Sequence, residues 1–289
     1  MLHFRYGTIG SAKTAPLLTA ACHFAERAMR CVLSRRVLLY IVVSIATAFL
    51  SVANNELDFG NETLSFRVTY KWGIIHKVAG SAGIKLTRDA DGYHAMLTAR
   101  TQPWADRIFM VRDTLTGRMR LGDMSPLLYD KSTHEDNQYR HDIINYTYHG
   151  NRAIATVKRF KRLRNGKTET ADTLMSALLP TVDMLSVYYY VRRLPYENMK
   201  KGSVSRANIF SGKKIEKLSI TYDGDEIVEL NDRKYDCYRI HFMFSSERIK
   251  NSSKPMKAWI VKTGSRIPIK LEGELPIGKI QILYNEPTK

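Results

Sequence analysis

Hydrophobic and polar residues alternate along most of the chain. In TLSFRVTYKW, residues 63–72, every second side chain is apolar. Alternation with a period of two is typical of a β-strand that buries one face. Residues 73–89 predict a second strand, in which Gly80 and Gly83 are expected to mark a bulge or a bend.

Comparable segments follow, separated by turn residues such as glycine, asparagine and aspartate. Residues 142–160 predict a hairpin, residues 217–244 three short strands divided near Gly224 and Asn231, and residues 256–284 three further strands. Strands do not alternate with helices, as they would in a parallel sheet. The pattern predicts a mainly β chain, folded as a single antiparallel β-barrel or half-barrel with one or two inserted helices. The shorter helix is predicted near residues 176–179.

The best helix prediction is TVDMLSVYYYVRRL, residues 181–194. Four apolar side chains share one helical face in this segment: Met184, Val187, Tyr188 and Val191. We expect that face to be buried against the curved sheet, with Arg192 and Arg193 near its rim. Thr181 or Asp183 is suited to cap the helix, because a short side chain with an oxygen accepts hydrogen bonds from the first backbone N–H groups.

The N-terminal part has the organisation of a secretory leader. Three arginines precede an uncharged, mostly apolar run at residues 37–50, and small residues follow up to Ala53. This order is typical of a signal peptide, so we expect export and cleavage after about Ala53. A retained membrane anchor is the alternative, because the run is close to the ~17 residues that can span a bilayer.

Met29 would begin a signal peptide of ordinary length. We therefore interpret it as the true start and residues 1–28 as a gene-start artefact. The expected organisation is a leader at residues 1–53 and one β domain at residues 54–289, a length that fits a single barrel or sandwich.

The chain is strongly basic, with 45 Lys and Arg against 28 Asp and Glu. Removing the leader leaves a net charge of about +12. Net charge indicates what kind of partner a protein attracts, and it says little about the fold. Outside the cytosol, the anions within reach are lipid head groups, lipopolysaccharide and acidic glycans. Cys237 is the only cysteine beyond residue 53 and lies in a predicted strand, so we expect a buried structural thiol and no disulfide within the domain.

Sequence motifs for catalysis are missing. The chain has no nucleophile elbow, zinc-protease motif, phosphate-binding loop or dinucleotide fingerprint. Two acidic stretches, at residues 89–92 and 223–226, lack the spacing of a calcium loop and are interpreted as turns. We therefore predict no catalytic residue, metal ligand or cofactor, although a pair of carboxylates that meet only in the folded chain is left open.

The basic segment VKRFKRLRNGK, residues 157–167, is the strongest charge feature. The simplest interpretation is a solvated hairpin end, where charges suppress pairing between sheet edges. Binding of an anionic envelope component is the second interpretation, with Arg159 and Arg162 as its contacts. Nucleic-acid binding is the least favoured, because we expect the protein to be exported.

Three stretches resemble the bacterial envelope family called domain of unknown function 3108. The opening strands resemble those of the family at six positions: Phe66, Val68, Tyr70, Trp72, Gly73 and Gly80. The predicted helix is similar to the central helix of the family at five: Asp183, Ser186, Tyr188, Tyr189 and Arg192. The last strands are similar at four: Trp259, Arg266, Pro268 and Gly278.

The resemblance covers most of residues 57–285. It implies an exported protein of the Gram-negative periplasm, with a β-barrel-like domain and an inserted helix. Analogy of fold extends to lipoprotein carriers, which cover a hydrophobic cavity with helices, but fold does not fix function. The resemblance implies no catalytic residues.

Together these observations predict a non-enzymatic periplasmic protein that binds an amphiphilic or anionic envelope component in or beside a curved sheet. Trp72, Tyr188 and Trp259 are the candidates for a cavity wall, with ordinary core packing as the alternative for each. Arg159 and Arg162 are the candidates for contacts to an anionic group. The expected partners are lipid, lipopolysaccharide, acidic glycan or envelope proteins, without nucleic acid. A structural protein of an envelope assembly is the first alternative, and a cell-wall or glycan hydrolase the second.

Overall fold

The structure is a computed structural model that describes residues 57–135, 137–245, 255–274 and 278–286. Residues Leu57–Lys289 form one compact unit. The expected leader, residues 1–53, lies outside the described residues. No helix among the described residues is long and apolar enough to cross a membrane.

The described chain is mainly β. The first wall is built from β1 (Glu62–Trp72), β2 (Ile75–Asp89), β3 (Gly92–Thr101), β4 (Val111–Met119), β5 (Pro126–Glu135), β6 (Gln138–His149), β7 (Arg152–Arg162) and β8 (Thr168–Leu178). The second wall contains β9 (Thr181–Val182), β10 (Val204–Phe210), β11 (Ile215–Leu230), β12 (Arg233–Ser245), β13 (Met256–Val261), β14 (Pro268–Glu274) and β15 (Lys279–Asn285). Helical turns occur at α2 (Pro103–Asp106), α3 (Ser186–Arg192) and the 3₁₀ helix η1 (Tyr196–Asn198).

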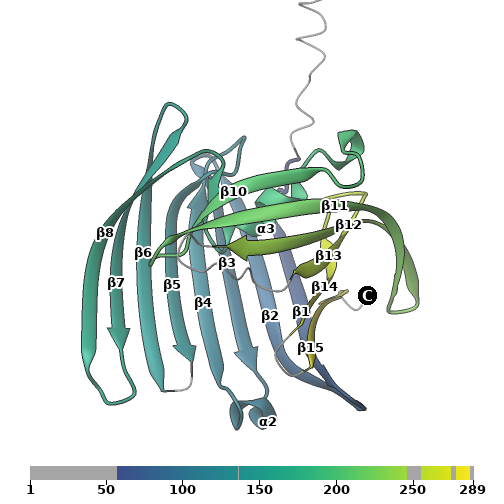
Figure 1. Ribbon diagram of the computed structural model, residues 1–289, viewed down its shortest axis with the longest axis horizontal. Helices are drawn as coiled ribbons and strands as arrows, with labels where there is room; N and C mark the ends of the chain where they lie inside the picture. Colours follow the sequence, from purple (N-terminus) through teal and green to yellow (C-terminus); the bar gives the residue numbers. More distant parts are fainter. Residues whose placement is uncertain (1–56, 136, 246–254, 275–277, 287–289) are drawn as a thin grey trace, which may run out of the picture. The chain divides into compact units, whose positions relative to one another are not determined.

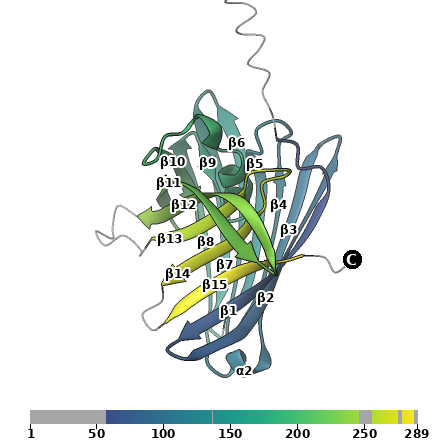
Figure 2. The same ribbon diagram turned by 90° about the vertical axis from the view of Figure 1, so that its right-hand side faces the viewer.

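All described strands belong to one sheet that nearly closes into a barrel. Strands β1 to β8 pair in chain order, β1 pairs with β15, and the order then runs back from β15 to β9. Every pair is antiparallel except β9 with β10. In Figure 1, β10 to β13 cross in front of the first wall, and Figure 2 shows β13 to β15 running from this layer to β1. The predicted barrel with inserted helices is confirmed.

The two ends of the strand order approach each other where β8 leads into β9. Asn208 of β10 donates from its backbone N–H to the carbonyl oxygen of Pro180 at 2.9 Å. Its side-chain amide donates to the carbonyl oxygen of Leu178, at the end of β8, at 2.7 Å. These bonds tie β8 to β10 at this end of the barrel.

The helix α3 is shorter than predicted. Thr181 and Val182 form β9, and the helix begins at Ser186. Asp183, one of the two predicted caps, accepts hydrogen bonds from the backbone N–H groups of Leu185 and Ser186 at 2.9 and 2.7 Å. The Ser186 hydroxyl in turn accepts from the backbone N–H of Asp183 at 2.9 Å. This reciprocal pair satisfies N–H groups that the helix itself leaves unpaired.

The predicted buried face of this segment is confirmed in part. Val187, Tyr188 and Val191 are half-buried against the apolar interior, whereas Met184 is exposed. Leu185, Tyr189 and Arg192 are buried more deeply. Arg192 is fully buried and makes two hydrogen bonds to the Glu62 carboxylate, at 2.6 and 2.9 Å. The predicted position of Arg192 near the rim is wrong, because the Glu62 carboxylate on β1, whose side chain is only 9% exposed, compensates the charge. The arginine thereby joins the helix to the first strand.

Two other local predictions are wrong. Residues 176–178 belong to β8, not to a helix. Gly224 does not divide two strands but lies inside β11, at φ 103°, where the register with β12 shifts by one residue. Glycine tolerates this φ at a bulge, so Gly224 bends one long strand instead of forming a turn between two strands. The predicted turn at Asn231 is confirmed, and the strand after it, β12, continues to Ser245.

The interior is divided between two apolar clusters. One joins the inner faces of β1 to β8 to Leu185 and Tyr189. The other joins the strands β10 to β13 to Val182, Leu194 and Tyr196. The helical segment therefore packs on both walls and occupies the space between them.

A third apolar cluster lies on the opposite face of the second wall. Ala258 and Ile260 belong to the cluster inside the barrel, so Trp259 between them points away from it. Val228 and Leu230, near the tip of the β11–β12 hairpin, cover the tryptophan. Cys237 is completely buried in this cluster, as predicted, and burial raises the pKa of its thiol to about 12.

Candidate functional site

The outward face of the first wall carries the candidate site. Phe66 packs in the same cluster as Leu185 and Tyr189, so its neighbours Ser65 and Arg67 point away from the helix. The same alternation applies along β2 to β7. Side chains on this face belong to the outer surface of the barrel.

The strand register brings arginines into a row across this outer face. Facing positions of β1 to β7 carry Arg67, Ser81, Arg100, Arg112, His134, Tyr139 and Arg162, which we call the arginine row. Arg100 and Arg112 face each other directly on β3 and β4. Two like charges at facing positions destabilise a sheet, and negative charge close to either arginine offsets that cost.

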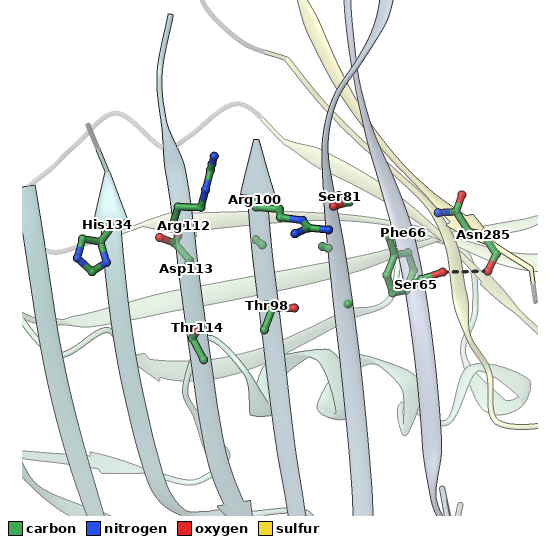
Figure 3. A pocket seen from close by; sticks show the side chains of 13 residues that line it. Ser65, Phe66, Ser81, Thr98, Arg100, Arg112, Asp113, Thr114, His134 and Asn285 are labelled. Carbon is green, nitrogen blue, oxygen red and sulfur yellow. Dashed lines mark hydrogen bonds between the residues drawn. The ribbon is translucent and has the colours of Figure 1, made fainter. Parts of the chain in front are cut away.

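A trough of about 700 Å³ lies along this part of the row. Beside the row, the facing positions of β1 to β4 are Ser65, Gly83, Thr98 and Thr114. Their small side chains leave space on the sheet, and three of them supply a hydroxyl group. Figure 3 shows Arg100, Arg112 and His134 on neighbouring strands, with Thr98 and Thr114 below them. Guanidinium and hydroxyl donors in one trough suit a phosphate or a carboxylate.

The two central arginines differ in how they are held. Arg112 donates two hydrogen bonds to the Asp106 carboxylate, at 3.0 and 2.7 Å, and a third to the Thr101 hydroxyl at 3.1 Å. These hydrogen bonds from Arg112 are the main reason that the pKa of Asp106 is lowered. Arg100 is exposed and has no hydrogen-bond or ion-pair partner among the residues that the structure describes. One guanidinium is therefore fixed, and the other has donors to spare.

Gly80 helps to place Arg100. A Cβ atom on Gly80 would lie 2.6 Å from the carbonyl oxygen of Arg100, which is shorter than real Cβ contacts. The strand bends at this point, because Val68 faces Gly80 while Thr69 faces Val78. The predicted bulge near this glycine is confirmed, and its effect is a close approach between β2 and β3 beside the trough.

A second hollow of about 420 Å³ continues the outer face toward the other end of β3 and β4. Lys85, His94 and Arg118 contribute to its lining. His94 pairs with Asp89 at 2.9 Å, whereas Arg118 has no hydrogen-bond or ion-pair partner in the described parts of the chain. Arg118 lies six residues from Arg112 along β4, about 20 Å in an extended strand. The basic surface is therefore long enough for an extended anionic ligand.

The predicted cavity residues lie in three different places. Tyr188 is in the core, with its ring centroid 5.0 Å from the Arg192 guanidinium. Trp259 lies in the cluster under the β11–β12 hairpin. Trp72 is 54% exposed at the end of β1 and lines an outer hollow of about 390 Å³ beside Lys71 and Lys279. The structure does not bring the three together in one cavity, and their ligand contacts stay predictions.

The two predicted arginine contacts point to opposite faces of β7. Arg159 faces the interior, where its Nε lies 3.4 Å from the Asp142 carboxylate. Arg162 belongs to the arginine row, with its guanidinium 5.8 Å from the Tyr139 ring. An odd spacing of three residues in a strand separates them in this way. Asp142 also pairs with Lys131 at 3.1 Å, so Lys131 and Arg159 share one counterion.

Sequence analysis did not identify Arg100 and Arg112. Both lie on the polar face of an alternating strand, and that alternation was the signal available in the sequence. The two arginines face each other because of the register in which β3 pairs with β4. Alternation alone does not determine that register.

Two acidic groups of the described chain, Asp113 and Asp183, have raised pKa values. Among the described residues, no group of three His, Cys, Asp or Glu side chains could hold a metal ion. Asp113 is the only acid that lines the trough, and burial together with Glu135 raises its pKa to about 6. Burial also raises the pKa of Asp183 to about 6, but this carboxylate serves the start of α3.

Comparison with known proteins gives a family and no activity. No curated protein and no solved structure matches the chain. A family model described as a protein of unknown function, DUF3108, matches residues 65–283, well over half of the chain. The match begins in β1 and ends in β15, so it spans the nearly closed sheet. The chain therefore belongs to the DUF3108 family of proteins of unknown function.

Proposed function

We propose that this protein is exported to the periplasm of a Gram-negative bacterium and binds an anionic envelope component there without chemical conversion. The ligand carries phosphate or carboxylate groups, as lipid head groups, lipopolysaccharide and acidic glycans do. It lies in the trough on the outer face of β1 to β4. The observation that carries the proposal is Arg100, which is exposed, lacks a partner among the described residues and directly faces Arg112.

Three further features support this function. Asp106 holds Arg112 in place, so part of the site is preorganised before a ligand arrives. Hydroxyl groups on the floor of the trough add neutral donors. The N-terminal segment has the pattern of a signal peptide, and the basic balance of the chain suits partners in an envelope rich in anions.

The trough favours binding over hydrolysis. Hydrolysis of a glycan by paired carboxylates requires two acids on either side of the bond. Asp113 is the only acid among the residues that line the trough, and its strand position faces the interior, next to Leu115 in the core cluster. Binding of an anion needs only the arginines and hydroxyl groups that line the trough.

A role in assembly is the second candidate function. The helical segment packs on both walls of the barrel, which favours surface recognition over transport inside the barrel. Under this alternative, the arginine row would contact an acidic surface of another envelope protein. The binding experiment below separates the two, because an assembly protein need not bind soluble polyanions.

The test uses a chain that begins at residue 54 and contains all the described strands. Binding to inorganic polyphosphate, polygalacturonate and lipopolysaccharide is measured by titration calorimetry at low and high salt. Arg100→Gln should weaken binding of the preferred probe about tenfold, the effect of losing one hydrogen bond to a charged group. Salt should weaken it further, because the site is exposed.

Arg206→Gln is the matched control. Arg206 is an exposed arginine on β10, outside the trough, so this variant loses the same charge elsewhere. If the Arg100 and Arg206 variants bind every probe as the unchanged protein does, the proposed function is wrong. An equal loss in both variants would show attraction by net charge without a site, which also contradicts the proposal.

A further inference from the structure

Apolar side chains gather at the end of the barrel where β1 joins β2 and β3 joins β4. Five of them are exposed: Trp72, Ile74, Val78, Ile108 and Phe109, which we call the apolar tips. Ile74 is fully exposed and Ile108 is 76% exposed. Single exposed apolar residues are ordinary, but a group from two neighbouring connections marks an interaction surface.

The two connections are joined to each other. Trp104 of α2 donates from its indole N–H to the carbonyl oxygen of Val78 at 2.8 Å. The backbone N–H of Gln102 donates to the carbonyl oxygen of Ala79 at 2.8 Å. Lys77 lies over the Trp104 ring at 4.6 Å. In Figure 1, α2 lies at the lower end of the barrel, and Figure 2 shows the end of β1 and β2 close to it.

These bonds keep the apolar tips outward. The connection between β3 and β4 is pinned to β2, so Ile108 and Phe109 project beyond the strands instead of folding onto the core. The side chains would therefore meet water unless something covers them. Each costs free energy in water, and that cost is relieved when the side chain enters an apolar medium.

Charges around the apolar tips are mostly positive. Residues 71–78 and 102–110 contain Lys71, Lys77 and Arg107 as cations and Asp106 as their only acid. Asp106 is already paired with Arg112. Arg100 and Arg112 of the arginine row lie at the base of the same connection, within two residues of its ends. Within the two connections, cations therefore outnumber acids, and the one other acid among the described residues that line the hollow beside Trp72, Glu272, is paired with Lys270.

We propose that this end of the barrel docks on the surface of a bilayer that contains anionic lipids. The apolar tips enter the boundary between head groups and acyl chains, where tryptophan and phenylalanine are favoured. Lys71, Lys77 and Arg107 contact the lipid phosphates. Shallow insertion alone gives weak, reversible binding, and apolar and cationic contacts together give stable docking.

The inference goes beyond the proposed function, because it concerns another surface and another medium. It also gives the trough an orientation, since Arg100 would be held close to the head groups. A protein partner suits the apolar tips less well. A stable protein interface buries about 800 Å² on each side, usually over a continuous patch, whereas these side chains stand on two narrow connections.

The experiment measures binding of the chain from residue 54 to vesicles by sedimentation. One set contains phosphatidylcholine alone, and the other contains phosphatidylcholine mixed with phosphatidylglycerol. We expect binding to the mixed vesicles, and loss of about tenfold or more in affinity for the double variant Ile74→Ser, Ile108→Ser, because two exposed apolar side chains no longer insert. Leu174→Ser with Ile227→Ser is the matched control, because both residues are 69% exposed outside the apolar tips.

Tryptophan fluorescence gives a direct measure of insertion. Of the three tryptophans in the chain, Trp72 and Trp104 lie at this end of the barrel, while Trp259 is buried under the hairpin. Lipids brominated on the acyl chains should quench the emission of the unchanged protein, and quenching should fall in Trp72→Phe. Quenching requires the indole ring to reach the acyl chains. A purely electrostatic contact with the head groups would not bring it to that depth.

Two outcomes would overturn the inference: unchanged vesicle binding in the tip variant, or vesicle binding without quenching by brominated lipid. Neither result bears on ligand binding in the trough, because soluble polyphosphate and polygalacturonate test that binding without a bilayer. A tip variant that loses vesicles but keeps its soluble probe supports the inference. Loss of the soluble probe in Arg100→Gln alone is the separate test of the proposed function.

Discussion

The buried ion pair between Arg192 and Glu62 gives the sharpest stability prediction. Glu62→Ala removes the carboxylate and leaves the guanidinium where it is, completely buried at the end of α3. An arginine in a protein does not lose its proton to escape this cost. The carbonyl oxygen of Ser265, at 2.6 and 2.9 Å, is its other hydrogen-bond acceptor.

The size of the effect follows from this geometry. Removing one partner of a buried ion pair costs about 3–5 kcal/mol, compared with ~0–1 kcal/mol for an exposed pair. The rings of Phe59, Tyr188 and Tyr189 lie 4.2, 5.0 and 5.4 Å from the guanidinium and partly compensate its charge. We therefore expect a loss of about 3 kcal/mol, near the lower end of that range. For a domain with a total stability of about 5–15 kcal/mol, this loss is large.

Urea unfolding followed by circular dichroism measures the loss, from midpoints at a constant slope. Asp123→Ala is the control, because Asp123 pairs with Arg120 at 2.5 Å and both side chains are open to solvent, 52% and 39% exposed. Arg192→Met in the Glu62→Ala background should recover part of the stability, since the uncompensated charge is then absent. A loss below about 1 kcal/mol in Glu62→Ala would refute the reasoning, because the pair would then behave as an exposed one.

Two further predictions concern single groups. Asp113 has a native pKa of about 6, above the value of about 3.9 in an unfolded chain, so the native state binds more protons and its stability falls as the pH rises from about 4 to about 6. Asp113→Asn should therefore raise the urea midpoint above pH 6, with a gain that shrinks toward pH 4; a gain independent of pH would contradict this. Cys237 has a thiol pKa of about 12 and is completely buried, so a chain from residue 54 should not react with a thiol reagent at neutral pH until it is unfolded in urea, and rapid reaction of the folded chain would show an open hairpin.

The sequence was sufficient for the class of fold because alternation is a local property. Strands β1, β6, β7 and β13 to β15 appear where hydrophobic alternation and turn residues predict them. Gly224 shows the limit of turn signals. The same residue type serves a turn and a bulge, and the choice depends on whether the partner strand β12 continues opposite it.

The helix shows a different limit. Apolar spacing correctly predicts that Val187 and Val191 pack on the interior, but it does not predict that Arg192 is fully buried. From sequence alone, an arginine is predicted to lie at the surface unless its counterion is known. Glu62 lies 130 residues earlier in the chain, so no local pattern connects the two. The cap at Asp183 was predictable because its partners lie within three residues.

The candidate site required the register of the whole first wall. Arg159 and Arg162 were chosen from a run of charge, but a run in a strand distributes its side chains over both faces. The useful grouping crosses the strands instead of following one of them. Arg100 and Arg112 come from two strands and face each other only because of the register in which β3 and β4 pair.

The division of charge between the two faces explains why we place the function outside the barrel. Inside, the helical segment covers the apolar part of the sheet, and the cations Lys131 and Arg159 share the carboxylate of Asp142. Outside, Arg100 and Arg118 have no such partner among the described residues. A protein gains nothing in stability from two arginines that face each other across a pair of strands. Asp106 compensates the charge of Arg112. An anion from elsewhere would do the same for Arg100, and the trough beside the two arginines has the space and the donors to accept one.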